Sequence, residues 1–416
     1  MTEKLTFLTL LLASIFAVSI SAAIIETGDV RDFNGVVTVG VDGEGSWTVD
    51  NGSQVTIAGI FIASGINSTG IVAIKDPGTV VNLDGAQNRI GVGEGGLGSM
   101  SIEGGAVVDG TANAANCEGS NCNFYVGNAA GSTGNLVVTG TGSTLKTMTT
   151  FVIGVAGVFL QDQDGFNFGI PSAETYASFE ISDNARVESK GVNISGGPGG
   201  GSTNGDEQSY AVVSVSDSSS WTMDQLGIST GPNAHAEVSV TNGSTITINN
   251  FLFTGFDASS EPILSISSGG VLEVGTSILS PTSDSKTRVY IDAATFHSNG
   301  AILPDYGQLK MDVLNNAEVS ANRYLIVSHQ TNSNAFIKLG KGAVMEAGDV
   351  VALGYNFFGG DPGSCHIIML PGSVIRSENV VVGPHCRVVG RGRIEGNFFN
   401  QGGFVGKGIK IISPEG

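Results

Sequence analysis

The four cysteines are the residues whose spacing points most directly to chemistry. They form two candidate pairs, Cys117 with Cys122 and Cys365 with Cys386, and the second pair is flanked by His366 and His385. In an exported chain, pairs of this kind are typical of disulfides. Free buried thiols and a metal site are the alternatives, although adjacent residues on a strand point to opposite faces and share one ion poorly. We expect disulfides at all four positions and no bound metal.

Two further segments resemble ligand-binding loops. Residues 91–96 match the pattern GxGxxG, which binds dinucleotides only where a helix follows. Residues 97–107 instead alternate between apolar and polar side chains, so we predict a structural turn and no cofactor. Residues 162–165 resemble part of a calcium loop but lack its remaining ligands, which favours a solvated acidic loop.

Cleavage of an acidic polysaccharide would need clustered carboxylates, or a base beside bound calcium. The five histidines are scattered, and the Gly-His-Gly pattern of polygalacturonases is absent. The basic cluster Arg387, Arg391 and Arg393 suggests contact with a polyanion, with a solvated strand face as the alternative. We therefore expect no catalytic site, and keep a lyase- or hydrolase-like β-helix enzyme as the alternative function.

Composition restricts the elements that can position these residues. Glycine accounts for 62 of 416 residues, hydrophobic residues for 41% and charged residues for 14%. Glycine at this density disfavours helices, while the apolar content argues against disorder. An all-β chain with many tight turns remains. The net charge of -19 opposes binding to nucleic acid.

The N-terminal segment differs from the rest of the chain. Residues 1–23 carry Lys4, an apolar run and the small residues Ser21, Ala22 and Ala23, as in a secretory signal. We predict cleavage after Ala23 and a secreted or cell-surface protein; a buried strand or an uncleaved anchor is the alternative. No later segment is apolar enough to span a membrane.

The rest of the chain repeats a three-part unit. An apolar residue followed by Gly leads to a short alternating strand, and then to a small-residue turn that ends in an apolar residue. The steps of 11 and 5 residues recur in two examples: Gly91, Ile102 and Val107, and Gly255, Ile266 and Val271. One such unit cannot bury its apolar face alone, so successive units must stack. We predict a parallel β-helix (β-solenoid) as a single domain over residues 24–416, with repeats clearest in 43–275 and more divergent in 276–416.

These repeats resemble the Gly-rich repeats of autotransporter passengers and of PEP-CTERM-associated exported proteins. The resemblance rests on the units above and on three related segments at residues 45–49, 142–145 and 219–223. The tryptophans Trp47 and Trp221 occupy equivalent positions in the first and third of these segments. It implies a secreted or surface-displayed β-helix without a catalytic motif.

Several stretches break the period and are expected to leave the solenoid as loops. They are residues 110–123, 159–176, 196–209, 277–287 and 355–364. Loops on a solenoid tend to gather on one face, where binding is expected. We therefore predict a non-catalytic structural or adhesive solenoid that displays loops to a cell-surface, glycan or protein partner. An uncapped last coil near Ile409 to Ser413 would expose strand edges, which predicts end-to-end self-association as well.

Overall fold

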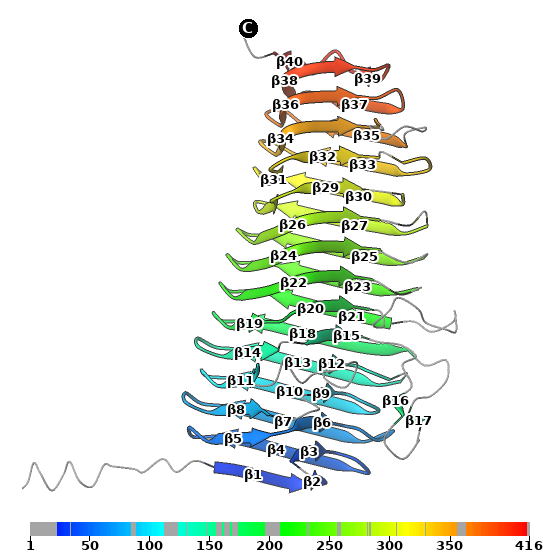
Figure 1. Ribbon diagram of the computed structural model, residues 1–416. Coiled ribbons are helices and arrows are strands. Elements are labelled where there is room, and N and C mark those ends of the chain that lie inside the picture. Colours follow the sequence, from blue (N-terminus) through cyan, green and yellow to red (C-terminus); the bar gives the residue numbers. More distant parts are fainter. Residues whose placement is uncertain are drawn as a thin grey trace, which may run out of the picture.

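The computed structural model describes most of the chain as stacked β-coils (Figure 1). The described residues are 23–33, 35–84, 89–111, 124–129, 131–147, 149–154, 160–161, 167–168, 174–195, 209–229, 231, 233–255, 259–280, 282, 284–304, 306–328, 330–355 and 363–413. Within them there are strands and no helix, and accordingly no helix that could cross a membrane. The predicted all-β solenoid is confirmed.

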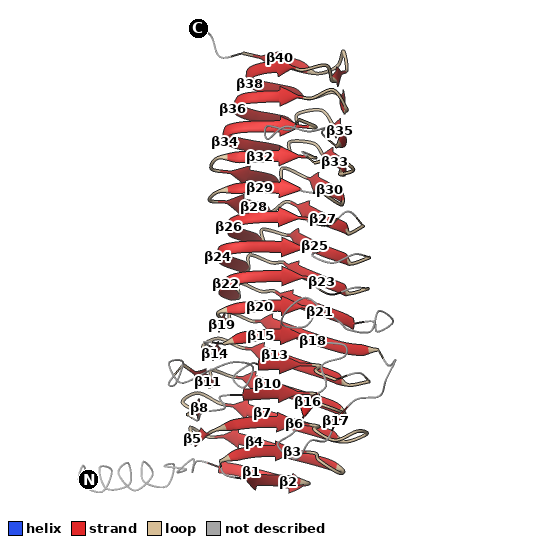
Figure 2. Ribbon diagram, turned by 45° about the vertical axis from the view of Figure 1, so that its right-hand side comes forward, coloured by secondary structure: helices blue, strands red, loops and turns tan. Residues whose placement is uncertain are grey.

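One long sheet, which we call sheet A, receives one strand from each coil. In order along the rod its strands are β1 (Ala23–Gly28), β4 (Glu44–Asp50), β7 (Thr69–Lys75), β10 (Leu97–Glu103), β13 (Thr133–Thr139), β18 (Thr175–Ser182), β21 (Ser209–Val215), β23 (His235–Val240), β25 (Glu261–Ser267), β27 (Lys286–Asp292), β30 (Gln308–Leu314), β33 (Asn334–Leu339), β35 (Ser364–Met369), β37 (Cys386–Gly390) and β39 (Phe404–Val405). All neighbours pair in parallel except β1 with β4. Figure 2 shows these strands side by side along the rod.

The second long sheet, sheet B, contains two columns of strands. The first column holds β5 (Gln54–Ile57), β8 (Val80–Leu83), β11 (Val107–Gly110), β14 (Thr144–Thr147), β19 (Arg186–Glu188), β28 (Thr295–Ser298), β31 (Glu318–Ala321) and β40 (Lys410–Ile412). The second holds β2 (Val30–Phe33), β3 (Val36–Val39), β6 (Gly59–Ile62), β9 (Arg89–Val92), β12 (Phe124–Val126), β15 (Thr150–Ile153), β20 (Gly191–Ile194), β29 (Ala301–Pro304) and β32 (Tyr324–Val327).

Six longer strands run through both columns and join them into one sheet. They are β22 (Ser220–Ile228), β24 (Thr245–Thr254), β26 (Val271–Leu279), β34 (Val344–Leu353), β36 (Val374–Val382) and β38 (Arg393–Asn400). A separate antiparallel pair is formed by β16 (Leu160–Gln161) and β17 (Asn167–Phe168).

The core lies inside the coils, where alternate residues of every strand form continuous apolar ladders. Met100, Leu136 and Phe179 are one such run, each opposite the next in neighbouring strands and each buried. Burial of a side chain of this size contributes roughly 1.5–3 kcal/mol. The period-2 pattern of the sequence therefore has a direct energetic cause, since every second residue is removed from water.

Many coils turn from sheet B back to sheet A through a residue with positive φ, whereas the turn after β36 starts at Gly383 without one. Glycine fills this position at Gly93, Gly127 and Gly255, whereas Ser195 and Ser229 adopt it elsewhere. A left-handed conformation costs a non-glycine residue roughly 1–2 kcal/mol. The repeat therefore tolerates Ser where the sequence pattern expects Gly, and this disguises the period.

The register corrects two details of the sequence pattern. Gly91 lies within β9 opposite Tyr125, whereas Gly255 lies at the coil corner, so the shared step of 11 residues joins positions that are not equivalent. Trp47 belongs to sheet A and Trp221 to sheet B, so the two tryptophans are not equivalent either. Turns of different length produce the first mismatch, whereas the second arises because the same Ser-Trp-Thr segment occurs in strands of both sheets.

Most of the expected insertions fall outside the described residues, but the residues that flank them are placed. Three of them depart between the second column of sheet B and sheet A, after Gly154, Ser195 and Tyr355. The insertion after Thr111 departs between the two columns of sheet B instead. The expected loop at 277–287 is wrong at both ends, because residues 277–279 complete strand β26 and residues 286–287 begin β27. The expected loop at 159–176 is wrong at its end, because residues 175–176 begin β18.

The first coil is covered by a strand pair that folds back on it. β1 and β2 run antiparallel to β4 and β3. Asp29, between them, accepts hydrogen bonds from the backbone N–H groups of Val41 and Asp42, both 2.8 Å, and from Arg31 Nε. These bonds, the Asp42 amide first, lower the pKa of the Asp29 carboxyl.

Candidate functional site

The GxGxxG segment is a structural turn that buries a carboxylate. Glu94 is 5% exposed, and its carboxylate accepts hydrogen bonds from Arg89 Nη2 and Asn128 Nδ2, all 3.2 Å long. Burial raises the pKa of the Glu94 carboxyl, against the opposing effects of Arg89 and Asn128. No helix follows the turn; β10 does, so the helix N-terminus that a pyrophosphate site requires is missing here.

Arg89 lies between two aromatic rings of neighbouring coils. Its guanidinium carbon is 5.1 Å from the ring centre of Phe61 and 5.0 Å from that of Tyr125. Phe61, Gly91 and Tyr125 share one register position, so the guanidinium fills the gap that Gly91 leaves between the rings. Each cation–π contact contributes about 1 kcal/mol. The cluster joins three coils, and its charged groups are mostly buried, with 16% of the Arg89 and 7% of the Glu94 side chain exposed, which makes it part of the scaffold.

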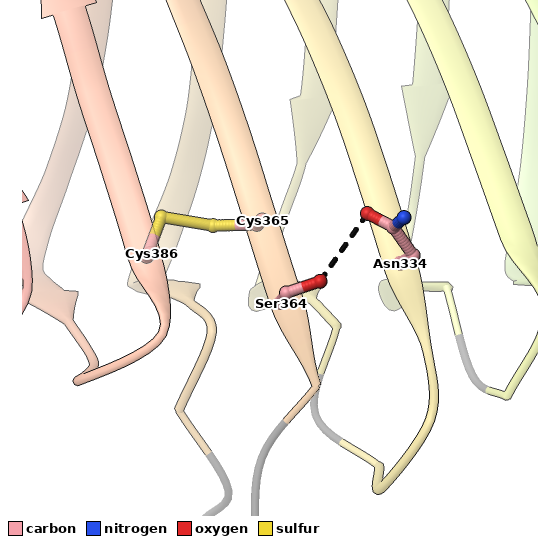
Figure 3. Close-up of a disulfide and its surroundings, with 4 residues drawn as sticks. All are labelled: Asn334, Ser364, Cys365 and Cys386. Atoms are coloured by element: carbon pink, nitrogen blue, oxygen red, sulfur yellow. Dashed lines mark hydrogen bonds between the residues drawn. A yellow bond between two sulfur atoms is a disulfide. The ribbon is translucent and has the colours of Figure 1, made fainter.

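The disulfide between Cys365 and Cys386 is formed, as expected. These residues lie opposite one another in β35 and β37, with their Cα atoms 4.5 Å apart, and both are buried (Figure 3). In the same figure, Ser364 Oγ donates a hydrogen bond to Asn334 Oδ1 in the next strand, 3.3 Å away. Because the two sulfurs are bonded to each other, neither can serve as a thiolate ligand, which removes the metal alternative at this pair. Cys117 and Cys122 lie outside the described residues.

The structure places Arg387, Arg391 and Arg393 in three different settings. Arg387 is exposed in sheet A, with its guanidinium carbon 5.3 Å from the ring centre of Phe404. Arg393 begins β38 in sheet B and pairs with Glu395 at 2.5 Å. Arg391 is exposed in the turn between them. The fold therefore does not bring the three arginines together into a single patch.

A second acidic group is held by arginines on the first column of sheet B. Glu395 accepts from Arg376 Nε at 2.8 Å and from Arg393 Nε, and the hydrogen bond from Arg376 is the main cause of the lowered pKa of its carboxyl. The group borders an open hollow of about 430 Å³ near Ile412. A carboxylate so strongly paired stays ionised and is a poor proton donor.

Sheet A carries a row of titratable and aromatic side chains on its outward side. Tyr176, Tyr210 and His235 are stacked ring on ring, with centroids 5.3 and 5.5 Å apart. His235 Nε2 is 3.8 Å from a Glu261 carboxylate oxygen, and Lys286 Nζ is 3.3 Å from the other. Among the described residues, this is the one contact in which a histidine nitrogen lies within 4.0 Å of a carboxylate oxygen, and the separation exceeds a hydrogen bond.

A neighbouring row on sheet A is basic at its C-terminal end. Arg288, Lys310, Phe336, His366, Arg387 and Phe404 occupy one register position in successive strands. All face outward, because their sequence neighbours point into the core. We call these six residues the basic column. Sequence spacing could not reveal it, since the separations between its members differ from coil to coil.

Comparison with known proteins adds neither a family nor a relative. No family model, curated protein or solved structure matches the chain. The resemblance of its repeats to those of autotransporter passengers stays an expectation drawn from the sequence.

Proposed function

We propose that the chain is an exported, non-catalytic β-solenoid that binds a cell-surface or glycan partner through its outer surface. The observation that carries this proposal is the placement of the insertions: Gly154, Ser195 and Tyr355 end three coils at the same corner of the rod. Insertions that leave a rigid scaffold at one corner are an arrangement suited to recognition.

Two further features support the proposal. The buried disulfide of Cys365 and Cys386 favours an oxidising compartment, as expected for an exported chain. In the described part of the chain, six acidic side chains are hydrogen-bonded to arginines and are therefore committed to ion pairs: Asp29, Asp42, Glu94, Glu346, Asp349 and Glu395.

The alternative, an enzyme that cleaves polysaccharides, is favoured by one observation only. His235 lies 3.8 Å from Glu261 on the outward side of sheet A, where the two could act as acid and base. However, Lys286 already forms an ion pair with Glu261. General acid–base catalysis requires groups within hydrogen-bond reach of one another and of a bound substrate, and the 3.8 Å between His235 and Glu261 exceeds a hydrogen bond.

The test is a binding and turnover experiment on purified, oxidised chain starting at Ile24. We expect retention on a glycan array or on intact cells, without release of reducing ends or unsaturated sugars from pectin or alginate. Depolymerisation that is abolished by Glu261→Gln or His235→Ala would establish the enzyme instead. Absence of binding to every cell type and glycan would reject the display function.

A further inference from the structure

We propose that the basic column on sheet A binds a linear acidic glycan that lies along the axis of the rod. This inference rests on the proposed function, because it names the chemical class of the glycan partner and the face that takes it. The cationic members of the column are Arg288, Lys310 and Arg387. The column also contains Phe336 and His366 between Lys310 and Arg387, and it ends at Phe404.

The parallel register sets the geometry of the column. Each strand from β27 to β39 contributes one residue at the same position, and neighbouring strands lie about 4.8 Å apart. Arg288 and Arg387 are four strand steps apart, so the charged part of the column extends for roughly 19 Å. A column of positive charges of this length fits a polymer with repeated negative charges better than it fits a small anion.

The arginines of the column lack the partners that other arginines have. In the described residues, which include all nine arginines of the chain, six have a carboxylate within 4.0 Å: Arg31, Arg89, Arg186, Arg323, Arg376 and Arg393. The remaining three are Arg288, Arg387 and Arg391. Acids outnumber bases by 38 to 19 in this chain, so two arginines in one column without a carboxylate partner among the described residues are a local exception.

Charge on the described strands of sheet A is divided along the rod. Strands β1 to β25 carry seven acids, Glu26, Glu44, Asp50, Glu103, Glu180, Glu237 and Glu261, and one base, Lys75. Strands β27 to β39 carry five bases, Lys286, Arg288, Lys310, Lys338 and Arg387, and two acids, Asp292 and Asp312. An anionic polymer is therefore attracted to the C-terminal half of this face and repelled from the other.

The side chains of the column favour an acidic glycan over other polyanions. A guanidinium binds a carboxylate through two parallel hydrogen bonds. Phe336 and Phe404 are 36% and 53% exposed and offer apolar surface to the C–H groups of a sugar. Nucleic acid would bring a dense phosphate backbone toward a chain of net charge -19.

A second copy of this chain fits the column less well. To bind the basic column, the second copy would have to present acidic side chains at the same register position in its N-terminal half. The residues at that position there are uncharged: Ser46, Ile71, Ser99, Asn135, Ser178 and Val212. Glu237, the one acid that follows them, cannot neutralise the whole basic stretch.

The experiment measures binding of the oxidised chain to polygalacturonate, alginate, neutral dextran and single-stranded DNA at several salt concentrations. The test variant is R288Q/R387Q, and the matched control is R186Q/R323Q, which removes two exposed arginines from sheet B and its turn. We expect the test variant to bind the acidic glycans at least about tenfold more weakly, with a salt dependence shallower by roughly one to two counterions. The control variant should bind as the unmodified chain does.

Four outcomes would overturn the inference. They are equal weakening by the control variant, failure to bind either acidic glycan at low salt, tighter binding to DNA than to the glycans, and a change of oligomeric state in the test variant without a change in glycan binding. Retained binding to cells or to a neutral glycan in any of these cases would leave the proposed display function standing, so the two failures are distinguishable.

Discussion

The carboxylate of Glu94 occupies the space that a side chain on Gly91 would need. A Cβ atom at Gly91 would lie 1.8 Å from Glu94 Oε1. The glycine that resembles part of a cofactor motif thus makes room for a buried ion pair with Arg89. Packing between coils is thus the reason for a glycine at position 91.

Substitution Gly91→Ala should therefore destabilise the coils around β9. The carboxylate would have to withdraw from Arg89 and Asn128, and we expect a loss of about 2 kcal/mol. Hydrogen exchange of β9 and β12 amides measures it locally, which suits a solenoid better than one global transition. Gly191→Ala is the control, because a Cβ at Gly191 meets no atom within 4 Å. Equal effects of the two substitutions would contradict the packing role.

The raised pKa of Glu94 predicts a specific pH dependence. Because the folded chain holds the proton more tightly than the unfolded chain, this group stabilises the fold below its ordinary pKa of 4.5, and that contribution is lost as pH rises through the raised value. Exchange of the β9 amides should accelerate over this window. Glu94→Gln should abolish the dependence, and an unchanged profile in that variant would refute the assignment.

Asp29 should stabilise the strands β1 and β2, which cover the first coil. Asp29→Ala removes two hydrogen bonds to backbone amides, and we expect faster exchange in β1 and β2 by a local loss of about 1 kcal/mol for this partly exposed group. Since the pKa of Asp29 lies below 3.8, the stabilisation is present above that pH and disappears as pH falls through the lowered value. Exchange in β30, far along the rod, serves as the internal control.

Removal of the disulfide should loosen the last coils. The bond closes a loop of 21 residues, for which a loss of about 3 kcal/mol is expected. The variant C365A/C386A tests this without the ambiguity of a reductant that also reaches Cys117 and Cys122. Limited proteolysis should cut the variant first among β35 to β39. Cleavage elsewhere, at the rate of the unmodified chain, would show that the bond carries little stability.

The mature exported chain should begin near Ile24. Strand β1 starts at Ala23 and pairs with β4. Cleavage after Ala23 therefore removes only the first residue of β1 and leaves the rest of its pairing with β4 intact. Intact-mass measurement of protein recovered outside the producing cell gives the start directly. Exported protein that retains Met1 would exclude cleavage.

The sequence by itself was sufficient to predict the solenoid. Alternating apolar residues separated by glycine-rich turns leave few other ways to bury one side of every short strand. The separation of Cys365 and Cys386 likewise predicted that they face each other in neighbouring coils. These properties depend on patterns within one repeat or between two adjacent ones, which the order of residues carries directly.

The tertiary structure decided which residues of distant repeats share a column. Turns differ in length, and a turn that is two residues longer leaves the strand pattern unchanged while it shifts every later spacing. The pattern therefore equated Gly91 with Gly255, and grouped Arg387 with Arg393 because they are close in sequence. Hydrogen bonding between coils sets the register instead, and it aligns Arg387 with Arg288, 99 positions earlier in the chain, on one face of the rod.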